Sequence, residues 1–106
     1  MKIRQLQHSD IKQVINLWTS SFSRNFNKIL NPDYLNNPSS TTMVVSDGNT
    51  IIGVASIHII YKLSRTLGLI EDVAVDKDHR GKGVGKSLVE KPVSYTHLTL
   101  PTILLV

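Results

Sequence analysis

The residues of this sequence best suited to chemistry are three closely spaced glycines. The stretch HRGKGVGKSLVE (79–90) places Gly81, Gly83 and Gly85 immediately before a helix-like run. Glycine lets a backbone approach a ligand closely, and successive N–H groups that open a helix form a concavity for an anion. The same stretch adds three positive charges, at Arg80, Lys82 and Lys86. The pattern therefore predicts a loop that binds phosphate groups.

Two common phosphate-binding motifs do not fit this loop. The phosphate loop of nucleotide hydrolases ends in Gly-Lys-Ser, as here, but Arg80 stands where its first glycine belongs. The dinucleotide fingerprint GxGxxG begins at Gly81, but Lys86 stands where its third glycine belongs. The pattern Arg-x-x-Gly-x-Gly fits in full from Arg80 to Gly85. A basic turn that merely starts a helix is the alternative, and three glycines disfavour it because each loses extra backbone entropy on folding.

The segment before the loop is an apolar run that contains two acidic residues. Thr66–Val75 predicts a strand, with Glu71 and Asp72 in its middle. Strict alternation places Leu69, Glu71, Val73 and Val75 on one face, and Ile70, Asp72, Ala74 and Asp76 on the other. A solvated pair of acids that flanks a strand is the alternative to a functional role for either residue.

The N-terminal part predicts a strand and an amphipathic helix. Residues 2–6 alternate as a short strand, and Ser9 or Asp10 caps a helix, with Gln13 closing a capping box. The helix has one apolar face, which we interpret as core: Ile11, Val14, Ile15, Trp18 and Phe22. A polar, Asn- and Pro-rich stretch follows at 23–40 and predicts a loop with a short helical turn.

Two further strands form a predicted hairpin. They are Thr42–Ser46 and Ile51–Tyr61, joined through Asp47-Gly48-Asn49. An Asp-Gly pair between apolar runs is a strong hairpin signal because glycine adopts the positive φ that tight turns need.

The composition indicates one small globular domain. The chain has 106 residues and no cysteine, which excludes disulfides, thiolate metal sites and a cysteine nucleophile. It has no signal-like start and no bilayer-length apolar run, so we expect a cytoplasmic protein without membrane contact. The four histidines show no metal-ligand spacing. The net charge of +4 is modest and no aromatic residues interleave with the basic ones, which disfavours a nucleic-acid partner.

The charge distribution changes sharply after Lys91. Seven charged residues lie in 77–91 and none lie in 92–106. The last segment, with Pro92 and Pro101, is similar to a string that recurs at the ends of unrelated translated fragments. We expect a partial domain at 1–91, followed at 92–106 by a non-native tail, with a surrogate edge strand as the alternative.

The segment IEDVAVDKDHRGKGVGKSLVE (70–90) resembles the cofactor motif of the GCN5-related N-acetyltransferase (GNAT) family. Its order of strand, Arg-x-x-Gly-x-Gly loop and helix is that of the family's acetyl-CoA site. The predicted elements upstream match the family's N-terminal half, so the resemblance covers about residues 1–91. It implies an α/β fold with a mixed, mostly antiparallel sheet and flanking helices, truncated at its C-terminus.

The resemblance also implies roles for individual residues. The acyl donor is acetyl-CoA, and the Val73 amide would polarise the thioester carbonyl. Glu71 would be the general base or the anchor of a primary amine, in a small molecule or a peptide. A homodimer is one possible assembly. The residues implied in cofactor binding are Val73, Ala74, Val75, Arg80, Gly81, Lys82, Gly83, Val84, Gly85, Lys86 and Ser87.

The chain also departs from the family after residue 91. A complete domain adds further strands and a helix there, including the tyrosine that commonly acts as general acid. Tyr95 lies in the suspect tail, and no motif supports that role for it. We therefore expect the 106-residue chain to be inactive. The alternative function is a non-catalytic CoA-binding or pseudoenzyme module.

Overall fold

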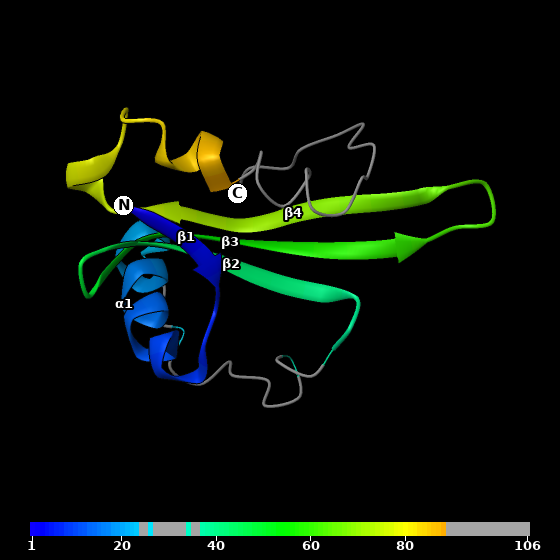
Figure 1. Cartoon of the computed structure of the whole chain (residues 1–106), viewed down its shortest axis with the longest axis horizontal. Helices are drawn as coiled ribbons and strands as arrows, with labels where there is room; N and C mark the ends of the chain where they lie inside the picture. The colour runs from blue at the N-terminus through cyan, green and yellow to red at the C-terminus, as the bar shows by residue number, and fades with distance from the viewer. Residues whose placement is uncertain (24–25, 27–33, 35–36, 89–106) are drawn as a thin grey trace.

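The computed structural model describes residues 1–23, 26, 34 and 37–88. Its strands form one sheet in the order β1-β2-β3-β4, in which all the pairings between neighbours are antiparallel (Figure 1). The elements are β1 (Lys2–Gln5), η1 (His8–Asp10), α1 (Ile11–Phe22), β2 (Ser40–Asp47), β3 (Thr50–Tyr61), β4 (Thr66–Val75) and η3 (Lys77–His79). Residues 84–88 are helical. The predicted α/β fold, with a mostly antiparallel sheet and flanking helices, is confirmed.

The predicted hairpin joins β2 and β3. Asp47 pairs with Thr50, and Gly48 between them has φ +61°, the region that favours glycine. β2 begins two residues before the predicted strand, at Ser40, and extends the pairing with β3 to His58. β3 and β4 run on together to a second hairpin, in which the Lys62 N–H donates to the Arg65 carbonyl at 2.9 Å.

The two faces of the sheet carry different helices, as Figure 1 shows: α1 lies on one face and residues 84–88 on the other. The core on the α1 face consists of Val14, Leu17, Val44, Ile51, Val54 and Ala74, with Leu6, Trp18 and Phe22 packed against it. The core on the opposite face consists of Met43, Val45, Ile52, Ala55, Ile57, Ile70, Val84 and Leu88. Val84 and Leu88 pack the helical segment against the sheet.

The start of α1 differs from the predicted capping box. Asp10 precedes the helix but makes no side-chain cap; its carboxylate instead accepts from the Gln7 N–H at 2.8 Å and from Arg4. Gln13 reaches the β2–β3 hairpin, where its Oε1 accepts from the Ile51 N–H at 2.9 Å. The predicted capping box is wrong because the Asp10 carboxylate has partners N-terminal to it, in Arg4 and Gln7, and Gln13 has a partner in β3.

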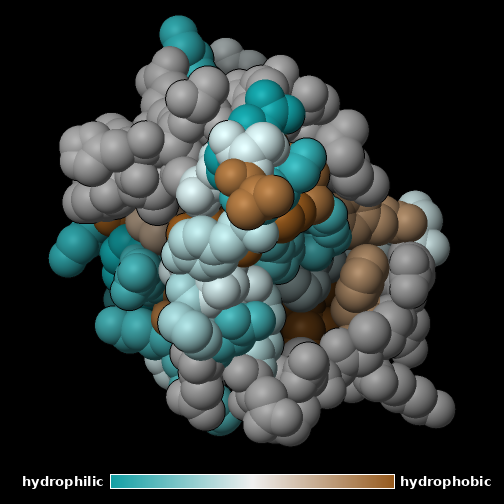
Figure 2. Space-filling view, turned by 90° about the vertical axis from the view of Figure 1, so that its right-hand side faces the viewer, coloured by the Kyte–Doolittle hydropathy of each residue, from teal (hydrophilic) through white to brown (hydrophobic). Residues whose placement is uncertain are grey.

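The β3–β4 hairpin projects from the body of the sheet (Figure 1). Tyr61 and Leu63 are exposed there. Figure 2 faces this end of the molecule and shows apolar surface among polar residues.

No helix in the described part of the chain is both long and apolar enough to cross a membrane. The tail at 92–106, and all of the 23–40 loop except residues 23, 26, 34 and 37–40, lie outside the described residues.

Candidate functional site

β4 contains one extra residue where it pairs with β3. Val54 pairs with Ala74 and Ser56 pairs with Glu71, so two steps along β3 correspond to three along β4. Asp72 lies in this β-bulge with φ +56°, a conformation uncommon outside glycine. The bulge breaks the strict alternation that the sequence predicted for this strand.

The bulge puts Glu71 and Val73 on different faces of the sheet, so the prediction that they share a face is wrong. Glu71 is opposite Ser56, which lies two residues from Val54 on the α1 face. Val73 and Val75 instead pack against the core on the opposite face, which contains Ile70. A shift of one residue moves every following side chain to the other face.

A side chain from α1 contacts the bulge. The Trp18 indole Nε1–H donates to the Asp72 carbonyl oxygen at 3.0 Å. The sequence predicted only core packing for Trp18. The ring does pack against the α1-face core, and its centroid lies 5.6 Å from that of Phe26. The hydrogen bond adds a polar link between the helix and the strand.

Buried hydroxyl groups lie in the same row of the sheet as Glu71. Thr42 and Ser56 are 4% and 3% exposed, and their hydroxyl oxygens are 3.0 Å apart. The Tyr34 hydroxyl lies 2.6 Å from the Thr42 hydroxyl. Sequence analysis missed this chain of hydroxyl groups because its members come from three separate segments, and only the pairing of β2 with β3 brings them together.

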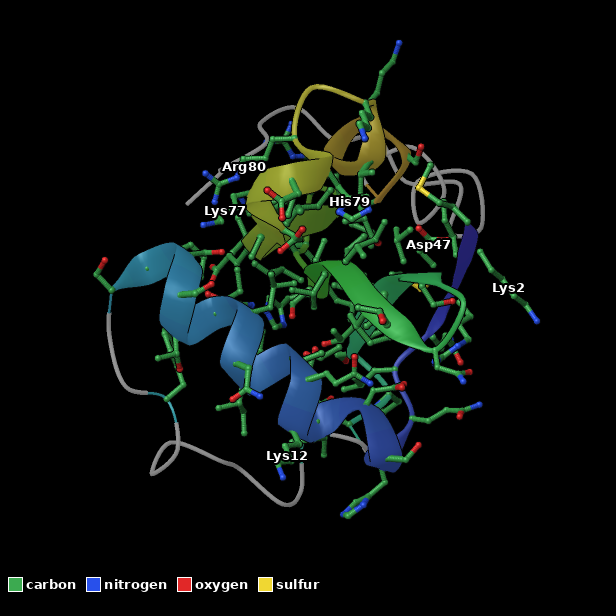
Figure 3. All side chains as sticks on the ribbon, turned by 90° about the vertical axis from the view of Figure 1, so that its left-hand side faces the viewer. Lys2, Lys12, Asp47, Lys77, His79 and Arg80 are labelled. Carbon is green, nitrogen blue, oxygen red and sulfur yellow. The ribbon has the colours of Figure 1, made fainter. Side chains whose placement is uncertain are left out.

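The segment after β4 is held by a histidine between two carboxylates. His79 Nδ1 lies 2.9 Å from Asp76 Oδ2, and its Nε2 lies 3.7 Å from Asp47 Oδ2. The hydrogen bond from His79 lowers the pKa of Asp76 below its usual value. Figure 3 shows His79 on the side of Asp47, with Lys77 and Arg80 extending from the other side of this segment. These contacts fix the segment that leads from the strand into the glycine loop.

The glycine loop has the backbone that its sequence predicts. Gly81 and Gly83 both have φ +80°, and a Cβ at either position would meet no atom within 4 Å. Open space in front of two glycines suits the close approach of a ligand. The Arg80 Nε–H donates to the Val75 carbonyl oxygen at 3.1 Å, which joins the loop to the end of β4.

The helix that follows the loop lies very close to β3. A Cβ at Gly53 would lie 2.8 Å from Val84 Cγ1 and 3.1 Å from Leu88 Cδ1, so glycine is required for this contact. The Ser87 hydroxyl donates to the Gly83 carbonyl oxygen at 2.9 Å and the Ser87 N–H donates to the same oxygen at 3.0 Å. The sequence did not single out Gly53, because a lone glycine within a strand does not reveal which element approaches it.

The structure brings most of the predicted cofactor residues to one place, and the residues there fit a phosphate-containing group. The strand segment 73–75 is joined to residues 80–87 through residues 76–79, and Val73 and Val75 pack with Val84 on the sheet face opposite α1. The three basic side chains of the loop are exposed: Arg80, Lys82 and Lys86. Glycine amides in open space and neighbouring positive charge are the chemistry that a pyrophosphate requires.

A model of the Acetyltransferase (GNAT) family matches residues 11–95. The chain belongs to this family. The match covers more than half of the chain, including α1, β2, β3, β4 and the glycine loop. A comparison with curated protein sequences found no match.

Solved structures place this GNAT chain among acetyltransferases of the same fold. An aminoglycoside acetyltransferase from an uncultured soil metagenomic sample, in complex with trehalose, has TM-score 0.80 and 23% identity, covering 99% of this chain and 76% of that one. An acetyltransferase from Trypanosoma brucei has TM-score 0.78 and 25% identity, with 99% and 81% covered. Glucosamine-6-phosphate N-acetyltransferase from Arabidopsis thaliana has TM-score 0.74 and 25% identity, with 99% and 80% covered.

Proposed function

We propose that this GNAT chain is the cofactor-binding part of an N-acetyltransferase that transfers acetyl from acetyl-CoA to a primary amine. The observation that carries the proposal is the continuity of the β4 bulge with the glycine loop. β4, with its bulge at Asp72, is connected through residues 76–79 to Gly81 and Gly83. Both glycines have positive φ and face open space. This arrangement provides amides for an acyl carbonyl and for phosphate groups within one continuous segment. A cytoplasmic location remains our expectation.

The loop would bind the pyrophosphate, and the strand would bind the arm that carries the acyl group. Acetyl-CoA would supply the acetyl group as a thioester: the amine nitrogen bonds to the acyl carbon, the C–S bond breaks, and CoA leaves and takes up a proton to become the free thiol. Hydrogen bonds to charged groups contribute roughly 1.5–3 kcal/mol each, so several loop amides together could hold the cofactor. The Val73 N–H would donate to the thioester oxygen and favour the charge that develops there.

Glu71 is the proposed general base or substrate anchor. It lies on the α1 face, in the row that includes the buried hydroxyls of Ser56 and Thr42. A carboxylate there can accept a proton from an ammonium group directly or through a water. The proposed acceptor is a small-molecule or peptide amine. Two of the structural relatives are an aminoglycoside acetyltransferase and a glucosamine-6-phosphate N-acetyltransferase.

A thiol-release assay with a panel of primary amines tests the chemistry. We expect the 106-residue chain to release thiol no faster than solvent hydrolysis, and a chimera of residues 1–91 with the C-terminal half of a family member to be active. In that chimera, Glu71→Gln should lower turnover by about 10²–10⁴-fold, the range for loss of a general base. A chimera that binds acetyl-CoA without turnover would favour the non-catalytic CoA-binding alternative.

A further inference from the structure

One hydrogen bond connects α1 to the bulge of β4. It contacts a peptide unit that has a carbonyl group on one side and an N–H group on the other. Trp18 Nε1–H donates to the carbonyl oxygen of Asp72. That carbonyl and the Val73 N–H belong to the same peptide unit. The unit is planar and trans, so its C=O and N–H point in opposite directions. A contact that fixes the carbonyl therefore also fixes the direction of the Val73 N–H.

We propose that Trp18 is a positioning residue, which aims the Val73 N–H at the acyl carbonyl by holding the Asp72 carbonyl from the α1 side. The inference rests on the proposed function, because the donor role of Val73 is part of that proposal. Trp18 itself touches neither the acyl donor nor the amine in this account.

The conformation of the bulge explains why a support is needed. Asp72 has φ +56°, which is sparsely populated for residues other than glycine. A residue held in such a conformation persists only when its surroundings constrain it. The indole N–H supplies a donor to the displaced carbonyl, and the rest of the ring is packed against buried side chains of α1 and the sheet. The packed Trp18 side chain therefore ties the bulge to α1.

The phenylalanines around Trp18 show which part of its role a phenylalanine could also fill. Phe22 packs against the same core, and its ring centroid lies 6.0 Å from that of Phe26. Aromatic packing in this cluster is thus provided by phenylalanine as well. A tryptophan differs from phenylalanine at this site by its N–H donor, and that donor is the group in contact with Asp72.

The arrangement also couples the indole to the bound acyl group. Hydrogen bonds in a chain polarise one another, by roughly 10–30% per bond. An acyl carbonyl that accepts from the Val73 N–H would strengthen the bond from the indole to the Asp72 carbonyl on the other side of the same peptide. Coenzyme A without an acyl group has no such carbonyl, so it would leave the indole bond unchanged.

The chain contains one tryptophan, so its indole N–H gives one assignable NMR signal. We would titrate the full 106-residue chain with acetyl-CoA and, separately, with CoA. The expected result is a downfield shift of the indole proton with acetyl-CoA that CoA does not reproduce. Equal shifts with the two ligands would contradict the proposal.

The variant Trp18→Phe keeps an aromatic ring and removes the donor. We expect it to bind CoA as the wild type does. The ratio of its acetyl-CoA affinity to its CoA affinity should fall roughly fivefold, which corresponds to the loss of one ordinary hydrogen bond. Amide hydrogen exchange should become faster at residues 72–75 and stay unchanged in β2. Val14→Ala, which loosens α1 packing without touching the bulge, should leave the affinity ratio unchanged.

The two proposals fail differently. If the wild type binds neither acetyl-CoA nor CoA, the proposed function is wrong, and exchange at residues 72–75 still decides whether Trp18 orders the bulge. If both ligands bind and Trp18→Phe changes neither the affinity ratio nor the exchange of these amides, Trp18 only packs and the positioning role is wrong.

Discussion

Asp10 is a buried carboxylate that Arg4 contacts with both of its terminal guanidinium nitrogens, at 2.6 and 2.9 Å. The hydrogen bond from Arg4 lowers the pKa of Asp10 below its usual value. The folded-state pKa therefore lies below the unfolded value of about 3.9. The stabilisation is fully present above that unfolded value and is lost as the pH falls through the folded pKa.

We expect Asp10→Asn to lower the free energy of unfolding at pH 7 by about 2 kcal/mol, because it removes charge-assisted hydrogen bonds. The difference from wild type should start to shrink below about pH 4, where the carboxylate of the unfolded chain takes up a proton, and should go on shrinking as the pH falls through the lower folded pKa. Urea unfolding at a series of pH values measures this. Asp78→Asn, at an exposed site, is the control and should change the free energy of unfolding at pH 7 little. A difference that stays constant down to pH 2 would contradict the account.

Asp72 has a backbone conformation in which a β-branched side chain would be strained. With φ +56°, a valine at this position should be less stable than a glycine by about 1–2 kcal/mol. Comparing Asp72→Val with Asp72→Gly cancels the loss of the carboxylate, which both share. At Leu67, in regular pairing with Ile60, the order should reverse, since glycine weakens a strand. Thermal unfolding of the four variants tests the predicted reversal of order.

At the scale of elements, the sequence predicted the strands well and the bulge not at all. Residues 66–75 were predicted as a strand, and β4 has those ends. Strict alternation assumes that each residue of a strand faces one residue of the partner strand. Only the pairing of β4 with β3 reveals the extra residue at Asp72. A weak signal existed, because Ile70 and Val73 are three residues apart, a spacing that strict alternation does not give to one face.

The conformation of the glycine loop could be predicted because it depends on a local pattern. Three glycines, basic residues and a following helix are all visible within one short segment. Trp18, Gly53 and the hydroxyls of Thr42 and Ser56 act through contacts with distant segments. Residue type alone could not assign those contacts, so sequence analysis treated Trp18 as core and passed over the others.

Close packing of residues 84–88 on β3 predicts that alanine destabilises the fold at Gly53 but not at Gly85. Gly53→Ala would place a Cβ 2.8 Å from Val84 Cγ1, on a stiff branched side chain, and should destabilise the fold by about 1–3 kcal/mol. Gly85→Ala meets only Val75 Cγ2 at 3.7 Å and should be neutral or stabilising, because alanine favours a helix. Adding Val84→Ala to Gly53→Ala should recover part of the loss. Equal melting temperatures for Gly53→Ala and the wild type would contradict this packing.

At the scale of the whole molecule, the proposed reaction requires that an acyl group be shielded from water. Among the described strands β4 pairs with β3 alone, so the other edge of β4 has no described strand beside it. Turnover would need this edge to be covered, because water weakens the hydrogen bonds meant for a thioester oxygen. We predict that the 106-residue chain lacks turnover. Amine-dependent thiol release that Glu71→Gln removes would show the chain to be a complete small enzyme.

The central claim is that the glycine loop binds the pyrophosphate of acetyl-CoA, and calorimetry with acetyl-CoA and ATP tests it most directly. We predict that the 106-residue chain binds acetyl-CoA more tightly than ATP, and that Gly83→Asp and Gly85→Asp abolish the binding by filling the loop and repelling phosphate. Gly48→Asp, which adds the same charge at a glycine of similar φ in the hairpin turn, should retain it. Equal affinity for ATP, with both loop substitutions silent, would contradict the account.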